Sequence, residues 1–267
     1  MKKSLLTLAV LSTLSSSLVF ADEAAAPAAQ PAAETPPYTI AYNVGLFSQY
    51  IFRGLTQTAG RPAIQGGVDF THSSGFYLGS WASNISWLED AKQGGDGYGY
   101  NEASLELDLY GGYRGAFKDV SYDVGLLQYV YPGTPVPGQV RAETTELYAQ
   151  VGYKWVTGKV SVVASSDAFG FRDQRGTYYA DLTANYPLTD TITLIAHVGR
   201  QEYDKNDAIK ASYTDWKLGA SKAFSNGVTV GGYYTDTNGE EFAYGGACYK
   251  GGNIASATGT VFIQKTF

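Results

Sequence analysis

Residues 48–88 read SQYIFRGLTQTAGRPAIQGGVDFTHSSGFYLGSWASNISWL, and this stretch decides the fold. Its second half holds two runs of strand character, joined by the three small residues at 73–75. In the first run Ile64, Val68 and Phe70 alternate with Gln65 and Asp69. Because successive side chains of a strand point to opposite faces, this alternation predicts strands with one apolar side and one polar side.

A further strand is predicted ahead of these two, over Thr39–Arg53, and Arg53-Gly54 is expected to end it. Its apolar face would carry Tyr42, Val44, Leu46, Tyr50 and Phe52. The same design recurs to the last residue and predicts about twelve strands, each near the ~10 residues of a tilted membrane-spanning strand. The other expected strands are 63–71, 76–85, 104–113, 121–131, 145–155, 159–167, 177–186, 191–201, 213–224, 228–236 and 257–267.

The connections between these strands alternate in length. Short ones are expected at 73–75, 114–120, 156–158, 187–190 and 225–227, and longer loops at 86–103, 132–144, 168–176, 202–212 and 237–256. Aromatic residues stand at strand ends, namely Tyr50, Phe52, Tyr113, Tyr153, Trp155, Tyr186, Phe224 and Phe267. Short turns on one rim, long loops on the other and aromatic girdles are typical of outer-membrane barrels. The sequence therefore predicts an all-β, antiparallel up-and-down transmembrane barrel of about twelve strands.

The N-terminal segment is typical of a secretory signal. Lys2 and Lys3 precede an apolar stretch that ends in the small-residue site Val19-Phe20-Ala21, so residues 1–21 are predicted to be removed. Residues 22–37 are rich in Ala and Pro and predict a flexible linker. The barrel is assigned to residues 38–267. No later stretch is apolar enough for a spanning helix, and the net charge of −6 argues against a nucleic-acid partner.

The opening stretch resembles the TorF family of outer-membrane porins. The most specific matching segments are Ser48–Gly54, Arg61–Gly67 and Gly75–Asn84, with further matches at 107–113, 129–133, 146–148, 213–219 and 265–267. The resemblance implies a porin in the outer membrane of a Gram-negative cell, without naming a solute. A terminal Phe267 implies recognition by the barrel-assembly machinery, and the expected surroundings are outer-membrane lipid and lipopolysaccharide.

An enzyme is the competing hypothesis. Nucleophilic catalysis needs a base beside Ser or Cys, and the chain has only two His. His72 lies at a predicted short turn and His197 in mid-strand, so we expect neither catalysis nor a transition-metal site. Acidic loop residues lack calcium-loop spacing and are expected to be solvated. No cofactor is expected.

The charges assigned to the inner face are the most informative functional feature. The expected pore-lining residues are Arg53, Asp69, Glu106, Asp108, Asp123, Glu146, Lys154, Asp167, Asp181, Asp215 and Lys217. Acids outnumber bases among them, which predicts a passive channel for small hydrophilic solutes with a weak cation preference. The alternative is a closed barrel whose loops bind a partner or lipopolysaccharide. A size near twelve strands decides neither this question nor the oligomeric state.

Overall fold

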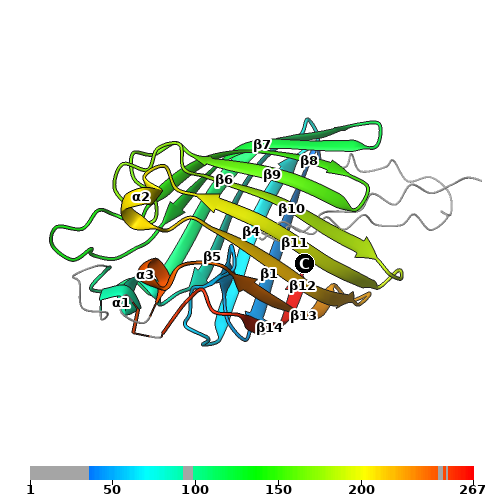
Figure 1. Cartoon of the computed structure of the whole chain (residues 1–267). Coiled ribbons are helices and arrows are strands. Elements are labelled where there is room, and N and C mark those ends of the chain that lie inside the picture. The colour runs from blue at the N-terminus through cyan, green and yellow to red at the C-terminus, as the bar shows by residue number, and fades with distance from the viewer. Residues whose placement is uncertain (1–35, 93–98, 246–248, 251) are drawn as a thin grey trace, which may run out of the picture.

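The computed structural model describes residues 36–92, 99–245, 249–250 and 252–267. The predicted signal and nearly all of the predicted linker lie outside these residues. Within them, twelve antiparallel strands form one closed barrel (Figure 1), which confirms the predicted fold. The strands are β1 (Tyr38–Phe47), β4 (Ala63–His72), β5 (Phe76–Asn84), β6 (Leu105–Phe117), β7 (Val120–Val130), β8 (Thr144–Tyr153), β9 (Val156–Val163), β10 (Tyr178–Pro187), β11 (Ile192–Glu202), β12 (Tyr213–Ala223), β13 (Val228–Thr237) and β14 (Thr258–Thr266).

The first and last strands close the barrel. β1 pairs with β14 from Asn43 opposite Thr266 to Phe47 opposite Phe262. The backbone N–H of Phe267 extends this seam by donating to the carbonyl of Tyr42 at 2.9 Å. Every wall strand therefore has a partner on both sides, as a strand must in hydrocarbon, where an unpaired backbone group costs several kcal/mol.

The two rims differ as the sequence predicts. We call one the short-turn rim, where strands are joined at residues 73–75, 118–119, 154–155, 188–191 and 224–227. The other is the long-loop rim, where the helices α1 (Trp87–Lys92), α2 (Asn206–Ile209) and α3 (Glu241–Tyr244) lie (Figure 1). No helix in the described part of the chain is long and apolar enough to cross a membrane.

The outward face of the wall is apolar. Leu46, Ile64, Leu147, Leu218 and Val261 are each more than half exposed. Exposed aromatic residues ring the short-turn rim, namely Tyr113, Tyr153, Trp155, Tyr186, Phe224 and Phe267. Aromatic rings suit the boundary between hydrocarbon and water, and the three Tyr and Trp155 add a polar O–H or N–H.

The predicted first strand is wrong beyond Phe47. The chain leaves the wall there and folds inward, where it forms β2 (Ile51–Phe52) and β3 (Leu55–Thr56). Tyr50 is buried and Phe52 is partly buried against interior aromatic residues, so neither belongs to a lipid-facing girdle. Alternation alone cannot distinguish a wall strand from a short ribbon that also has two faces.

The predicted connection at 114–120 is also too long. β6 and β7 continue to Phe117 and Val120, and only Lys118 and Asp119 form the turn. Lys118 has a positive φ of 56°, a backbone conformation that two-residue hairpin turns require. No glycine marks this turn in the sequence, which explains why its length was overestimated.

Candidate functional site

The inward hairpin, residues 48–62, is the feature that sets this barrel apart. β2 and β3 pair through Ile51–Thr56 and Phe52–Leu55, and Arg53 and Gly54 make the turn. Both turn residues have positive φ, 47° and 81°, as in a type I′ turn. A positive φ is uncommon for a side chain as large as Arg, so contacts outside the turn must stabilise it there.

The Arg53 side chain makes contacts with three wall strands. Its Nη2 lies 2.7 Å from the Oε2 of Glu146 on β8, and its Nη1 donates to the Oε1 of Gln201 on β11 at 2.8 Å. The guanidinium carbon lies 4.4 Å from the ring centroid of Tyr179 on β10. Both Arg53 and Glu146 are buried. The planar guanidinium of Arg, with its forked donors, suits this pair of acceptors together with an aromatic ring.

Other hairpin residues contact the rest of the wall. The Tyr50 hydroxyl donates to Glu106 on β6 at 2.6 Å, and the Gln49 amide donates to the Thr258 hydroxyl on β14 at 2.7 Å. At Gly54, an added Cβ would lie 2.5 Å from side-chain carbons of both Asp215 and Thr237. The hairpin thus touches the wall strands β6, β8 and β10 to β14, and lies inside the lumen.

Two clusters of buried apolar side chains fill the barrel around the hairpin on its long-loop side. The first includes Tyr50, Trp81, Tyr129 and Tyr131, and the second includes Leu55, Tyr203, Tyr213 and Tyr244. The rings of Tyr50 and Trp81 meet edge to face, with centroids 5.4 Å apart. The hairpin is therefore held by apolar packing as well as by polar contacts.

Beyond Arg53 the lumen is polar. His197 lies between two acids, with its Nε2 3.2 Å from Asp215 and its Nδ1 3.8 Å from Asp181. The Tyr179 hydroxyl donates to Asp215 at 2.8 Å. A cavity of about 110 Å³ borders Arg53, His197 and Lys217. A smaller cavity of about 30 Å³ also borders Arg53.

The structure places nine of the eleven expected pore-lining residues inside the barrel. They are Arg53, Asp69, Glu106, Asp108, Asp123, Glu146, Asp181, Asp215 and Lys217. Whether they line a conducting pore stays a prediction. Several already have tyrosine partners, since Tyr110 donates to Asp69 at 2.7 Å and Tyr77 donates to Asp123 at 2.6 Å.

Two of the expected inner-face positions are wrong. Lys154 lies exposed in the turn between β8 and β9, with a φ of 55°. Asp167 lies beyond the end of β9 in a loop, where its carboxylate accepts a hydrogen bond from the backbone of Asp173. The Lys154 error comes from placing the turn at 156–158, whereas the structure turns at 154–155. The Asp167 error comes from extending the next strand to residue 167, whereas β9 ends at Val163.

Two basic residues of the lumen lie outside the predicted inner face, because the turns after β6 and β8 lie at 118–119 and 154–155 rather than at 114–120 and 156–158. Lys159 lies on β9 with its Nζ 4.4 Å from the Tyr148 ring centroid, and Arg114 on β6 lies 3.9 Å from that of Tyr77. An earlier turn at Lys154-Trp155 would have placed Lys159 on the inner face. The inner charges are consequently less one-sided than the sequence indicates.

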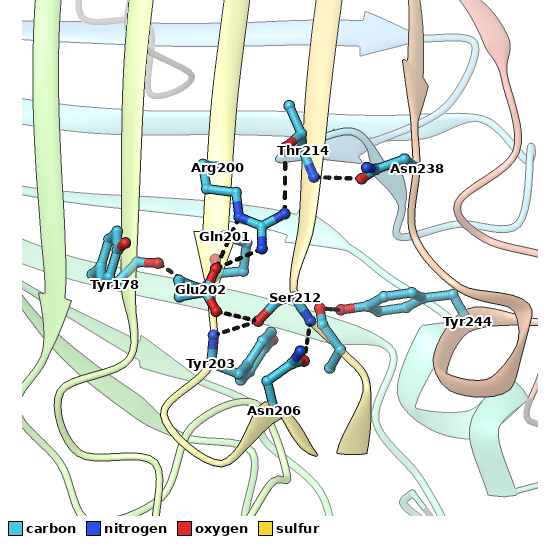
Figure 2. Close-up of polar contacts among 11 residues, drawn as sticks. Tyr178, Arg200, Gln201, Glu202, Tyr203, Asn206, Ser212, Thr214, Asn238 and Tyr244 are labelled. Carbon is cyan, nitrogen blue, oxygen red and sulfur yellow. Dashed lines mark hydrogen bonds and ion pairs between the residues drawn. The ribbon is translucent and has the colours of Figure 1, made fainter. Parts of the chain in front are cut away.

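The long-loop rim carries a separate polar network (Figure 2). Arg200 pairs with Glu202 at 2.6 Å, and the Ser212 hydroxyl donates to Glu202 at 3.2 Å while accepting from the backbone of Tyr203. On the neighbouring loop the Tyr244 hydroxyl donates to the carbonyl of Ala211 at 2.5 Å. Burial raises the pKa of Tyr244 well above its ordinary value, so the hydroxyl keeps its proton. These bonds hold the loop between β11 and β12 to the end of β11 and to the neighbouring loop.

Solved outer-membrane proteins are similar to this chain in structure. The KdgM porin aligns with a TM-score of 0.52 at 8% identity, over 85% of this chain and 98% of that one. The COG4313 outer membrane channel from Pseudomonas putida F1 aligns with a TM-score of 0.46 at 14% identity, over 90% of this chain and 100% of the other. The first likeness shows that the chain has the fold of an outer-membrane porin.

Among curated proteins, none matches the sequence. A family model described as "Bacterial protein of unknown function (Gcw_chp)" covers residues 31–267, which include the whole barrel. The chain therefore belongs to the Gcw_chp family of bacterial proteins of unknown function.

Proposed function

We propose that the protein is an outer-membrane channel for small hydrophilic solutes whose lumen is obstructed by the hairpin 48–62. The observation that carries the proposal is a closed barrel, apolar outside, with charged residues in its interior and a cavity of about 110 Å³ alongside the hairpin. A barrel made only for anchoring could fill this space with apolar side chains. The resemblance to TorF porins agrees with this proposal, which assigns the protein no catalytic activity.

The proposed surroundings follow from the two rims. The long-loop rim would face the outside of the cell, in contact with lipopolysaccharide, and the short-turn rim would face the periplasm. Phe267 is 70% exposed at the end of β14, where the barrel-assembly machinery could reach it. The apolar outer face would contact lipid.

We also propose that the channel has a weak preference for cations. Seven acids lie on the inner side of the described wall, namely Asp69, Glu106, Asp108, Asp123, Glu146, Asp181 and Asp215, against the bases Arg53, Arg114, Lys159 and Lys217. Charge on the wall biases which ions pass. The excess of acids is smaller than the sequence indicates, so the preference should be slight.

A second candidate function is a closed barrel whose loops bind a partner. The apolar packing of Trp81, Tyr131 and their neighbours around the hairpin favours it, because such packing resists displacement of the hairpin.

Conductance in planar bilayers tests the two candidates. The comparison is between wild type and a variant in which residues 50–57 are replaced by a Gly-Ser linker of equal length. The channel proposal predicts low conductance for wild type and a severalfold larger conductance for the variant. A folded, heat-modifiable variant that conducts no better than wild type would favour the closed barrel.

A further inference from the structure

The wall residues that contact Arg53 form a binding site, and the Arg53 side chain of the hairpin occupies it. Glu146 supplies a carboxylate, Gln201 an amide oxygen and Tyr179 an aromatic face, and all three belong to the barrel wall. These are the groups that recognise a guanidinium ion, which donates in a plane and stacks on rings. We infer that the lumen contains a recognition site for guanidinium compounds, occupied in this state by Arg53. This inference rests on the proposed channel function.

The carboxylate of Glu146 is only partly used by Arg53. Its Oε2 accepts from Arg53 at 2.7 Å and from the Tyr129 hydroxyl at 3.2 Å. Its Oε1 is buried and accepts no hydrogen bond from any described residue. A carboxylate prefers to engage a guanidinium with both oxygens. A free solute can take up that geometry, whereas Arg53 is tethered to a two-residue turn.

The hairpin also positions Arg53 at a cost to its backbone. Arg53 has a φ of 47°, a region that most side chains avoid. Arg53 borders both lumen cavities, of about 110 and 30 Å³. A solute in the lumen can therefore approach the group that it would displace.

Competition between solute and Arg53 gives the site a role in opening. Arg53 competes as a tethered, pre-positioned group, at an effective concentration of at least about a millimolar, the value for a short flexible tether. A guanidinium solute at comparable concentration would replace Arg53 on Glu146, Gln201 and Tyr179, and the hairpin would lose its main polar anchor. Lys159 and Lys217 also border the smaller cavity, so a carboxylate on the same solute would find a partner.

The test uses the full chain with Arg53→Ala, which empties the site of its own guanidinium. In planar bilayers, guanidinium ion at millimolar, non-denaturing concentration should block the variant's current. Tetramethylammonium, a cation without hydrogen-bond donors, should block far less. Adding Glu146→Gln should raise the blocking concentration of guanidinium by about tenfold or more, as expected for loss of a charged hydrogen bond.

A second readout keeps the inference independent of conduction. Guanidinium at the same concentrations should raise the melting temperature of detergent-solubilised Arg53→Ala, because a ligand that binds the folded state stabilises it. It should not do so in Arg53→Ala/Glu146→Gln. Equal effects of guanidinium and tetramethylammonium, or effects that survive Glu146→Gln, would overturn the site. If no variant conducts but the melting shift appears, the channel fails and the site stands.

Discussion

The two halves of the lumen are built on opposite principles. On the long-loop side of Arg53 the interior is packed with aromatic rings, such as Trp81 against Tyr50, 5.4 Å between centroids. On the short-turn side it holds paired polar groups such as His197 and Asp215, 3.2 Å apart, and the cavity of about 110 Å³ extends from Trp81 to His197 and Lys217. Packing opposes movement, whereas polar groups around a cavity can exchange partners with solute or water. If the protein is the proposed channel, the hairpin is a barrier that packs against the first half of the lumen and faces solute in the second.

The largest expected change in stability comes from removing an aromatic ring from the packed half of the lumen. Trp81→Ala should cost about 3–5 kcal/mol of unfolding free energy, because it removes a buried ring and leaves a cavity. Urea unfolding of lipid-reconstituted protein measures this. The control is Trp155→Ala, whose side chain lies 38% exposed at the short-turn rim and should matter clearly less. Equal costs would mean that the packed half contributes no special stability.

A smaller loss of stability is expected from a substitution that displaces the hairpin at its turn. Gly54→Ala should cost about 1–3 kcal/mol by overpacking, since its Cβ would come 2.5 Å from Asp215 and Thr237. Gly60 has a similar φ of 72°, but nothing lies within 4 Å of an added Cβ, so Gly60→Ala controls for backbone strain alone.

The readout for this pair is conductance together with stability. Gly54→Ala should raise the conductance over wild type and Gly60→Ala should leave it unchanged. If the two variants have the same conductance, the close packing of Gly54 against β12 and β13 does not hold the hairpin in place.

Removing two charges from the lumen should change ion selectivity by less than the preceding substitutions change stability and conductance. Asp69→Asn with Asp123→Asn removes two negative charges from the lumen while keeping the acceptors for Tyr110 and Tyr77. In the hairpin-replaced variant, the reversal potential in a salt gradient should move toward anions. The shift should be clearest at low salt, since charges are screened beyond about 8 Å at physiological ionic strength. A shift toward cations would contradict the assignment of these acids to the pathway.

The smallest effect is expected at the rim. Arg200 and Glu202 are 43% and 35% exposed, and exposed pairs contribute about 0.2–1 kcal/mol. A double-mutant cycle of Arg200→Ala and Glu202→Ala should give a coupling in this range that falls as salt is added. A coupling well above it would mean that the rim network (Figure 2), rather than apolar packing, holds the loops.

The sequence by itself determined the barrel. Apolar and charged residues alternate along each strand, as Leu105, Leu107 and Leu109 do with Glu106 and Asp108. Because side chains on a strand repeat every two residues, this alternation shows which residues face the lumen and which face outward. Loop lengths assign the rims. These are local properties, so they can be read without knowing which residues meet, and they place most of the inner acids correctly.

Only the tertiary structure decided what fills the barrel. Residues 48–53 alternate like a wall strand, yet the chain turns inward after Phe47 because Arg53 finds Glu146 and Gln201, 93 and 148 residues away along the chain. Likewise, the position of one turn, at 154–155, decides that Lys159 lies inside while Lys154 is exposed. Partners so distant in sequence leave no local pattern, since their meeting depends on closure of the whole barrel.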